Sequence, residues 1–312
     1  MEQGPLMLDV DTGVDDAAAL ALAIGLGADL VAVSTVAGNV PIDRSTSNTR
    51  RVLSYLGRAD VPVYRGASRP LVASYRDAAH VHGDNGLGGV ELPTPPAPEE
   101  STTGPEALVR MAARHAGALT LVTLGPLTNL AIALSLRPEI VRQVARLVVM
   151  GGAYATAGNV TPHAEFNIYV DPDAAQQVLA APWPDLTVVG LDVTHRTVLP
   201  RATWQAIGAD QGAAADLLRA ILARTFTERS MTGFYLHDPL AVAVALDPTL
   251  VSGLTVGVDV VTRGEHRGRT QIRDRGHVRV ATDVDATPFL RRFCAAVGIE
   301  LIGDPAAAER PE

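Results

Sequence analysis

Short apolar runs alternate with longer mixed segments along this chain, from residue 5 to residue 297. The runs at 5–10 and 30–36 lack regular polar positions, which is typical of parallel strands buried on both faces. The segments at 14–26 and 43–56 predict helices, and the second has a polar face. Alternating strands and helices predict an α/β fold.

The same alternation continues to the end of the chain. Further strands are expected at 61–64, 119–124, 147–150 and 186–190, and two or three more between 254 and 281. Further helices are expected at 105–116, after 125–129, at 171–179, at 210–230, after 237–239 and at 286–297. No linker separates these elements, so we expect one domain over 1–304 and a disordered tail at 305–312.

Two segments, 66–103 and 158–167, lack periodicity and are rich in glycine, proline and polar residues. A loop as long as the first is usually functional or disordered when it lies inside a compact domain. Its part from His80 to Gly86 contains two histidines, and we interpret it as a flap over a site.

Composition narrows the class of protein. With 312 residues, 47% of them hydrophobic and 19% charged, the chain can form a sizeable core. A net charge of −8 argues against a polyanionic partner such as nucleic acid. The lone Cys294 cannot form an internal disulfide and is expected to be a small buried apolar residue. No apolar run approaches the ~18 residues of a membrane helix, and no leader precedes the first strand, so a cytoplasmic protein is expected.

Four aspartates surround the first turn of the chain. Asp9 and Asp11 end the first strand and lie two residues apart, so we expect both on the same side of it. Asp15 and Asp16 fall in the first turn of the following helix, and Gly13 permits the tight turn between the pairs. Four carboxylates this close repel one another unless a cation is present. Oxygen ligands of this kind suit calcium or magnesium.

Simpler explanations of the aspartates do not account for all four. Asp15 or Asp16 alone could cap a helix. The haloacid-dehalogenase phosphatases need threonine or valine where this chain has Gly13. An EF-hand needs an oxygen ligand at the same place and a glutamate where Leu20 stands.

Polar residues also follow other predicted strands. Asn39, Leu124 and Met150 each lie where a strand ends, as Asp11 does. Open α/β sheets bind ligands at the carboxyl ends of their strands, so distant residues can meet in one crevice.

Seven short motifs carry a resemblance: Asp9-Val-Asp11-Thr-Gly-Val-Asp15-Asp16, Gly38-Asn39, His82-Gly83, Gly125-Pro-Leu-Thr-Asn129, Met150-Gly-Gly, Ala164-Glu-Phe-Asn167 and His237-Asp238-Pro239. In this order and spacing, over residues 5–300, the chain resembles the inosine-uridine preferring nucleoside hydrolases.

That resemblance implies an open, mostly parallel Rossmann-like sheet flanked by helices, and hydrolysis of the N-glycosidic bond of purine or pyrimidine ribonucleosides to ribose and free base. It implies calcium held by Asp11, Asp16, Asp238 and the carbonyl of Leu124. It also implies ribose held by Asp15, Asn39, Asn159, Glu165 and Asn167, with Met150 beneath the sugar. Asp11 would be the general base and His237 would lie near the leaving base. A homodimer or homotetramer is implied as well.

Three positions depart from the family pattern. Thr12 stands where proline is usual, which removes stiffness from the turn but no ligand. Leu124 stands where threonine is common, and only its carbonyl is expected to be used. Val40 replaces a polar residue, which leaves the positioning near the base open.

The chemistry gives these residue types their tasks. Glycoside cleavage passes through an oxocarbenium-like transition state, so the sugar must be held and water delivered to C1′. Calcium accepts six to eight oxygens and acidifies water less than zinc does, which favours a carboxylate, Asp11, as base. Histidine as a residue type titrates near neutrality, so His237 is expected to protonate the base, although it could also simply pack beside Asp238.

The remaining aromatic and histidine residues are less defined. His82 is expected to contact the 5′-hydroxyl or base from the flap, or only to order the loop. Tyr235 and Phe226 are expected near the base, Phe166 is expected to pack in the wall, and no role is assigned to His80 or His163.

Two other functions use the same aspartates. A metal-dependent phosphohydrolase would want basic residues or a glycine-rich loop for phosphate, and the cluster has neither. A non-catalytic calcium- or ribose-binding protein would not explain His237 directly before Asp238.

Overall fold

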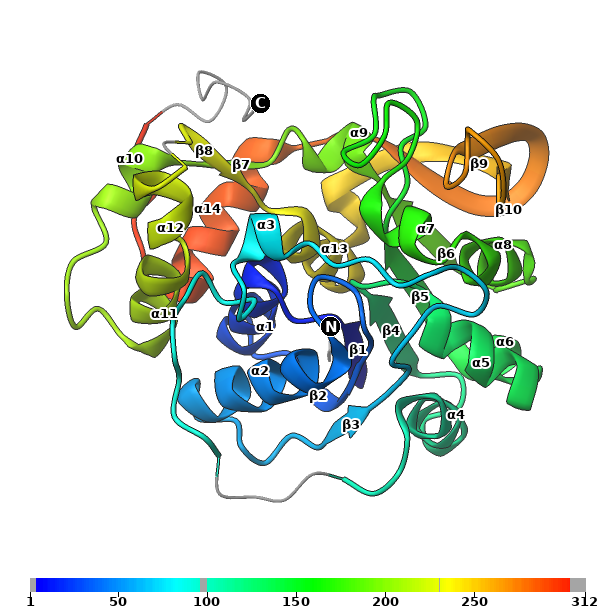
Figure 1. The fold of residues 1–312 in the computed structure, drawn as a ribbon, viewed down its shortest axis with the longest axis horizontal. Coiled ribbons are helices and arrows are strands. Elements are labelled where there is room, and N and C mark those ends of the chain that lie inside the picture. Colours follow the sequence, from blue (N-terminus) through cyan, green and yellow to red (C-terminus); the bar gives the residue numbers. More distant parts are fainter. Residues whose placement is uncertain (1–3, 96–99, 230, 304–312) are drawn as a thin grey trace.

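A mostly parallel sheet of eight strands forms the centre of the computed structural model, which describes residues 4–95, 100–229 and 231–303 (Figure 1). The order across the sheet is β3-β2-β1-β4-β5-β6-β10-β9, and only the β9–β10 pairing is antiparallel. The strands are β1 (Leu6–Val10), β2 (Leu30–Thr35), β3 (Val63–Arg65), β4 (Leu119–Thr123), β5 (Val144–Met150), β6 (Leu186–Val189), β9 (Val251–Val260) and β10 (Thr270–Val284). The predicted α/β class and parallel sheet are confirmed.

Helices and one small second sheet complete the described chain. The helices are α1 (Val14–Gly25), α2 (Ile42–Tyr55), α3 (Ala79–His82), α4 (Gly104–Arg114), α5 (Thr128–Leu136), α6 (Ile140–Gln143), α7 (Phe166–Val170), α8 (Pro172–Ala180), α9 (Leu191–Thr194), α10 (Arg201–Gln205), α11 (Ala213–Ile221), α12 (Ala223–Thr227), α13 (His237–Leu246) and α14 (Ala286–Val297), with a 3-10 turn at Pro248–Leu250. Strands β7 (Val198–Pro200) and β8 (Gly233–Tyr235) pair antiparallel.

Side chains alternate between two cores, one on each face of the sheet. In β1, Leu8 and Val10 point into the core shared with α1, α13 and α14. Met7, which directly precedes Leu8, points to the opposite face, into the core shared with α4, α5 and α8. Because both faces are covered, the strands can be apolar throughout, as the sequence pattern predicts (Figure 1).

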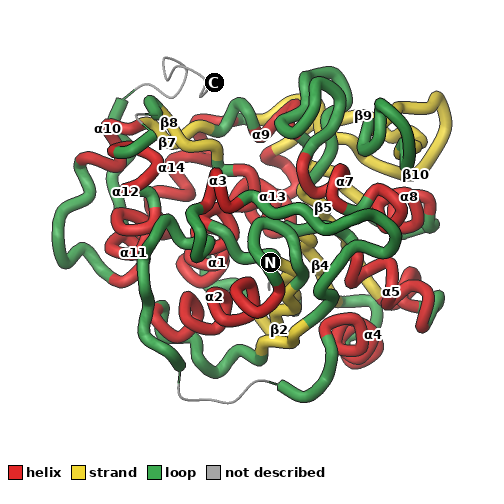
Figure 2. The backbone as a smooth tube through the Cα atoms, viewed as in Figure 1, coloured by secondary structure: helices red, strands yellow, loops and turns green. Residues whose placement is uncertain are grey.

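The strand order locates the crevice. The run β3-β2-β1-β4-β5-β6 is the order of a doubly wound sheet. From β1 the chain adds strands first toward β3 and then, on the other side, toward β6, so the direction in which strands are added reverses between β1 and β4. The loops after β1, β2, β4 and β5 therefore meet at one edge. The segment that leads into α3 crosses in front of this edge, and Leu71 in it donates a backbone hydrogen bond of 2.8 Å to Asp171 at the start of α8 (Figure 2).

The prediction of one helix over 210–230 is wrong. Asp210 and Gly212 have φ of 60° and 114°, which a right-handed helix cannot include, so α11 begins only at Ala213. Leu222, with ψ of −8°, separates α11 from α12. The long loop 66–103 contains the short α3, and the sequence pattern did not predict the short elements α7, α9, α10, β7 and β8.

None of the helices that the structure describes is both long and apolar enough to cross a membrane. The predicted tail at 305–312 lies outside the described residues.

Candidate active site

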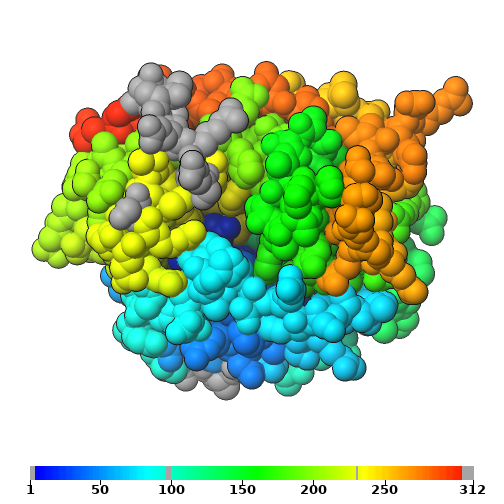
Figure 3. Space-filling model, turned by 45° about the horizontal axis from the view of Figure 1, so that its top comes forward, coloured from blue at the N-terminus to red at the C-terminus, as the bar shows by residue number. Residues whose placement is uncertain are grey.

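A cavity of about 490 Å³ opens at the carboxyl ends of the strands. Figure 3 shows it as a hollow between the cyan, green and yellow segments, with blue atoms of the N-terminal part at its floor. Its lining includes these predicted site residues: Asp15, Asn39, His82, Leu124, Met150, Asn159, Glu165, Asn167, His237 and Asp238. The tertiary structure therefore brings together residues spread over more than 220 positions of the chain.

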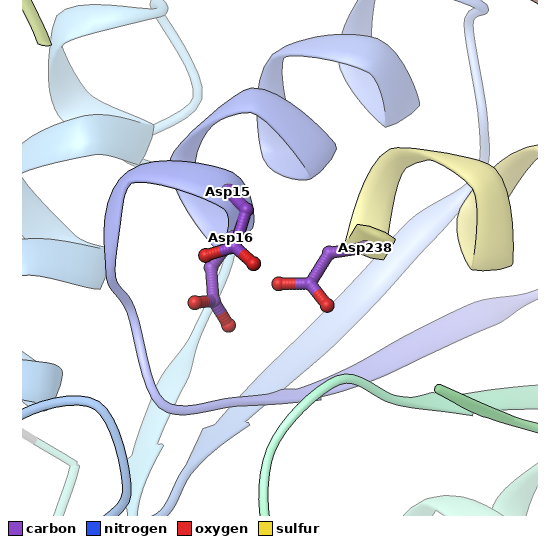
Figure 4. Close-up of side chains that lie close together, drawn as sticks. All are labelled: Asp15, Asp16 and Asp238. Carbon is purple, nitrogen blue, oxygen red and sulfur yellow. The ribbon is translucent and has the colours of Figure 1, made fainter. Parts of the chain in front are cut away.

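Three carboxylates converge at the floor of the cavity. One oxygen each of Asp15, Asp16 and Asp238 lies within 4.8 Å of the other two (Figure 4). Asp15 and Asp16 come from the first turn of α1 and Asp238 from the first turn of α13, and these two helices pack together. Because two helix N-termini point at the group, their dipoles favour negative charge there.

Asp11 lies beside this group and is fully buried, so it is not among the residues that line the cavity. Its Oδ2 accepts a hydrogen bond of 2.6 Å from the Asn39 backbone, and its Oδ1 accepts one of 3.2 Å from Asn39 Nδ2. The same Nδ2 donates to Asp16 Oδ2 at 3.1 Å, so Asn39 links the two carboxylates. A Cβ on Gly38 would lie 1.9 Å from Asp11 Oδ2, which shows why a glycine precedes Asn39.

Burial makes these carboxylates costly to ionise. Burial and the charge of Asp15 raise the pKa of Asp16 to about 6, and burial raises the pKa of Asp15 to about 6. The pKa values of Asp11 and Asp238 are raised well above their ordinary range, first by burial and then by the neighbouring aspartates. A bound cation would reverse this effect, because it favours the charged forms.

The turn between β1 and α1 is held by Asp16. Its Oδ1 accepts from the backbone of Asp11 at 3.1 Å and its Oδ2 from Gly13 at 2.8 Å. A Cβ on Gly13 would lie 2.6 Å from His82 Nδ1, so glycine is needed for the flap to approach. Asp16 therefore both fixes this turn and contributes a carboxylate to the group at the floor of the cavity.

Asp9 does not join the other three aspartates. Its Oδ1 accepts from Ser34 Oγ at 2.6 Å and from Asn129 Nδ2 at 2.8 Å, beneath the site. Burial raises its pKa to about 7. The expectation that Asp9 and Asp11 face the site together is wrong, because Asp11 lies beyond the end of β1 and no longer follows the strand alternation.

A second polar group forms the wall after β4 and β5. Glu165 caps α7 and accepts from the backbone of Gly152 at 3.0 Å, of Asn167 at 2.8 Å and of Ile168 at 3.1 Å. Asn167 Nδ2 donates to the carbonyl of Leu124 at 2.6 Å. Burial raises the pKa of Glu165 and the three backbone N–H groups partly offset it.

The other wall residues surround this group. The sulfur of Met150 lies 3.4 Å from Asn167 Nδ2. Asn159 Oδ1 accepts from the backbone of Phe166 at 2.9 Å and holds the loop before α7 in place.

His237 begins α13 and faces the cavity beside two other rings. Its Nδ1 lies 2.8 Å from the hydroxyl oxygen of the buried Thr194. Its ring centroid is 5.3 Å from that of Tyr235 and 5.7 Å from that of His195, and both rings line the cavity. Burial, with the nearby His195 and His82, lowers the pKa of His237 to about 3.

Other aromatic and histidine residues divide between cavity and core. His80, Phe166 and Tyr235 line the cavity, as expected for the last two. Phe226 is fully buried and packs on Trp204 at 5.1 Å between centroids, so the expectation that it contacts the base is wrong. His163 packs against His266 instead.

The base preference was expected to depend on residues 70–90 and 222–237, and the sequence analysis named none of these lining residues individually: His195, Thr225, Arg229, Met231 and Phe234. One sequence signal pointed to Thr194 and His195: they lie after the strand at 186–189, just as Asn39 lies after the strand at 30–35. No local sequence signal singled out Thr225, which lies in α12, or Arg229, which follows that helix.

The arrangement of the whole chain matches solved structures of hydrolases with the nucleoside hydrolase fold. A plant nucleoside hydrolase, PpNRh1, superposes with a TM-score of 0.89 at 31% identity, covering 95% of this chain and 99% of the other. A purine-preferring ribonucleoside hydrolase from Gardnerella vaginalis gives a TM-score of 0.86 at 35% identity, covering 94% and 98%.

Sequence comparison assigns the family. The family model of the inosine-uridine preferring nucleoside hydrolases matches residues 6–291, and this chain belongs to that family. A curated relative, the pyrimidine-specific ribonucleoside hydrolase RihA of Shewanella woodyi, is 38% identical over 299 residues, which cover 92% of this chain and 95% of the relative. The protein is thus an enzyme, a nucleoside hydrolase, as the seven motifs predicted.

Proposed function

We propose that this enzyme is a calcium-dependent ribonucleoside hydrolase that cleaves the N-glycosidic bond to release ribose and a free base. The observation that carries the proposal is the convergence of Asp15, Asp16 and Asp238 in a cavity that also holds Glu165 and Asn167. Ribose offers vicinal 2′- and 3′-hydroxyls, and carboxylates, amides and a hard cation are the groups that bind them.

The donor set fits a hard divalent cation. Asp15 Oδ1 is buried without a hydrogen-bond partner, and the clustered carboxylates raise one another's pKa values. All the candidate ligands are oxygens: the carboxylates of Asp11, Asp16 and Asp238 and the carbonyl of Leu124. Such a set favours calcium or magnesium over zinc or copper. When bound, calcium would supply positive charge and further coordination positions for hydroxyl oxygens.

The residues around the sugar then have distinct tasks. We expect Asp15, Asn39, Asn159, Glu165 and Asn167 to bind the ribose hydroxyls, with Met150 beneath the ring. Glu165 is held by three backbone N–H groups, so its remaining lone pairs can accept from a hydroxyl without movement. Asp11, oriented by two hydrogen bonds from Asn39, would take a proton from the water that attacks C1′.

The lining favours bases with carbonyl oxygens. Apart from Asp15, Glu165 and Asp238 at the sugar end, the described lining contains no carboxylate. Arg229, His80 and Thr225 offer donors, and arginine cannot accept a hydrogen bond. Uracil at C4 and hypoxanthine at C6 carry a carbonyl that such donors can meet, whereas cytosine and adenine carry an amino group, itself a donor, at the same positions. We therefore propose that uridine and inosine are cleaved faster than cytidine and adenosine.

One experiment tests the metal and the reaction together. Base release from uridine, inosine, cytidine, adenosine and guanosine is followed by chromatography before chelator treatment, after it, and after calcium is added back. We expect release to stop with the chelator and to return with calcium. Full activity after exhaustive chelation would refute the metal requirement, and equal rates on all five nucleosides would refute the base preference.

Assembly as a homodimer or homotetramer and a cytoplasmic location stay predictions. Sedimentation velocity of the purified enzyme measures the assembly directly.

A further inference from the structure

A buried hydroxyl stands behind the ring that faces the leaving base. Thr194 is the last residue of α9, has no exposed surface, and lies 2.8 Å from His237 Nδ1 through its Oγ1. Its carbonyl accepts from the backbone N–H of Thr197 at 3.1 Å and from the Thr197 hydroxyl at 2.9 Å, which fixes this turn. Since Nδ1 faces the buried threonine, Nε2 is the ring nitrogen on the cavity side.

We propose that Thr194 is a positioning residue for departure of the base. Its hydroxyl donates to Nδ1 of His237 and thereby keeps the ring hydrogen on Nε2, where it can reach the base. This inference rests on the proposed function, because it needs a base that leaves from the sugar.

The surroundings keep the ring in this orientation. Tyr235 lies beside it with an interplanar angle of 37°, and His195 with one of 58°. Leu236, the residue before His237, donates a backbone hydrogen bond of 2.9 Å to the carbonyl of Thr197. The turn after α9 and the start of α13 are therefore joined at two points, and a ring flip would separate Nδ1 from Thr194.

The tautomer of His237 matters because the departing base carries negative charge when the glycosidic bond breaks. When the C1′–N bond breaks, its electron pair stays on the base, while the oxygen of water bonds to C1′ and the water proton goes to Asp11. An Nε2–H hydrogen bond stabilises the negative charge on the base until the base takes a proton from solvent. With the hydrogen on Nδ1 instead, Nε2 would present a lone pair to that charge and would oppose departure.

Two variants of Thr194 separate positioning from packing. Thr194→Val keeps the shape but cannot donate, and Thr194→Ser keeps the hydroxyl. For Thr194→Val we expect kcat on uridine or inosine to fall about 100-fold, in the range seen when one hydrogen-bond donor to a developing charge is lost. With p-nitrophenyl riboside, whose leaving group needs no such assistance, we expect kcat to fall less than about 3-fold.

The serine variant should keep both activities. An equal loss of kcat on both substrates in Thr194→Val, or no loss on either, would overturn the inference.

The tautomer of His237 can also be measured by spectroscopy, and this test does not depend on the activity of any variant. Nitrogen NMR of the ¹⁵N-histidine-labelled enzyme reports which ring nitrogen carries hydrogen, and His237→Ala assigns the signal. An Nε2–H tautomer for His237 supports the inference, and an Nδ1–H tautomer overturns it. Because this measurement uses the enzyme without substrate, its outcome is independent of whether nucleosides are hydrolysed, and base release from wild-type enzyme tests the proposed function separately.

Discussion

The Nδ1 atom of His82 accepts a hydrogen bond of 3.2 Å from the backbone N–H of Val14. The same nitrogen lies 3.7 Å from Asp15 Oδ1. Burial lowers the pKa of His82 to about 4, so the ring is neutral at pH 7 and this contact is not an ion pair. The flap that carries His82 is thus anchored to the helix that carries Asp15 and Asp16.

Loss of this anchor should weaken nucleoside binding. His82→Ala leaves the buried Val14 N–H without a partner, at a cost of about 1–3 kcal/mol, and we expect KM to rise about 10-fold or more. In His82→Asn the amide oxygen can replace Nδ1, so KM should rise less. Limited proteolysis at 83–90 checks the cause, since the alanine variant should be cut faster. Unchanged KM and cutting in both variants would show that the anchor is unimportant.

The metal-free enzyme should be more stable at pH 5 than at pH 8. Asp15 and Asp16 have pKa values of about 6 in the folded state against 3.8 ordinarily. Between these values the folded state binds more protons, so stability is fully present below pH 4 for these groups and is lost as pH rises through 6. Burial also lowers the pKa values of His82 and His237, which opposes this trend below about pH 6.5. The raised pKa values of Asp9, Asp11 and Asp238 act in the same direction as those of Asp15 and Asp16 and outweigh the two histidines. The expected net loss from pH 5 to pH 8 is on the order of a few kcal/mol.

Thermal unfolding of the chelator-treated protein from pH 5 to pH 8 measures this dependence, and calcium should abolish it. Asp238→Asn is the control, because it removes one buried charge and should raise the metal-free Tm at pH 8. A Tm that increases with pH in the metal-free protein would contradict the prediction.

Deoxynucleosides should be poor substrates. Glu165 and Asn167 are fixed by backbone hydrogen bonds before any ligand binds, so a missing 2′-hydroxyl leaves buried polar groups unpaired. A site of this kind can discriminate about 10⁴-fold. The ratio of kcat/KM for uridine and 2′-deoxyuridine measures the effect, and comparable values would exclude hydroxyl recognition.

His237 should act without titrating between pH 5 and pH 8. Burial, with the neighbouring histidines, lowers its pKa to about 3, so it stays neutral over this range. We expect His237→Ala to lose about 100-fold in kcat on uridine or inosine and to keep activity on p-nitrophenyl riboside. The pH profile of the variant should keep the shape of the wild type. A new or missing limb near pH 6.5 would assign that ionisation to His237.

The amide of Asn129 should be a main source of stability beneath the site. Its Nδ2 donates to Asp9 Oδ1 and to the carbonyl of Thr35, both at 2.8 Å, and its Oδ1 accepts from the backbone of Ala67 at 2.8 Å. Asn129→Ala leaves these groups without partners and should lower the free energy of unfolding by at least about 2 kcal/mol.

Urea unfolding measures this loss. Gln177→Ala is the matched control, because its amide also donates to a backbone carbonyl and a side chain, but near the surface. It should cost about 0.5 kcal/mol or less. Equal losses in the two variants would mean that the buried network contributes little.

The sequence by itself determined the α/β class, the order of the main strands and helices, and most residues of the cavity. These depend on local signals: apolar runs long enough to be buried strands, and polar groups such as Asp11 and Asn39 placed where the runs end. Seven motifs in fixed order added the family, which the comparisons confirm.

Only the tertiary structure decided which carboxylates meet and what lies behind each ring. Asp15 and Asp238 come together because α1 and α13 pack with their N-termini side by side. Asp9, two residues from Asp11, instead accepts a hydrogen bond from Asn129, which lies 120 positions away in the sequence. Thr194 reaches His237 because the turn after β6 pairs with the segment before α13. Contacts between elements distant in sequence leave no periodic or local signal, so packing alone settles them.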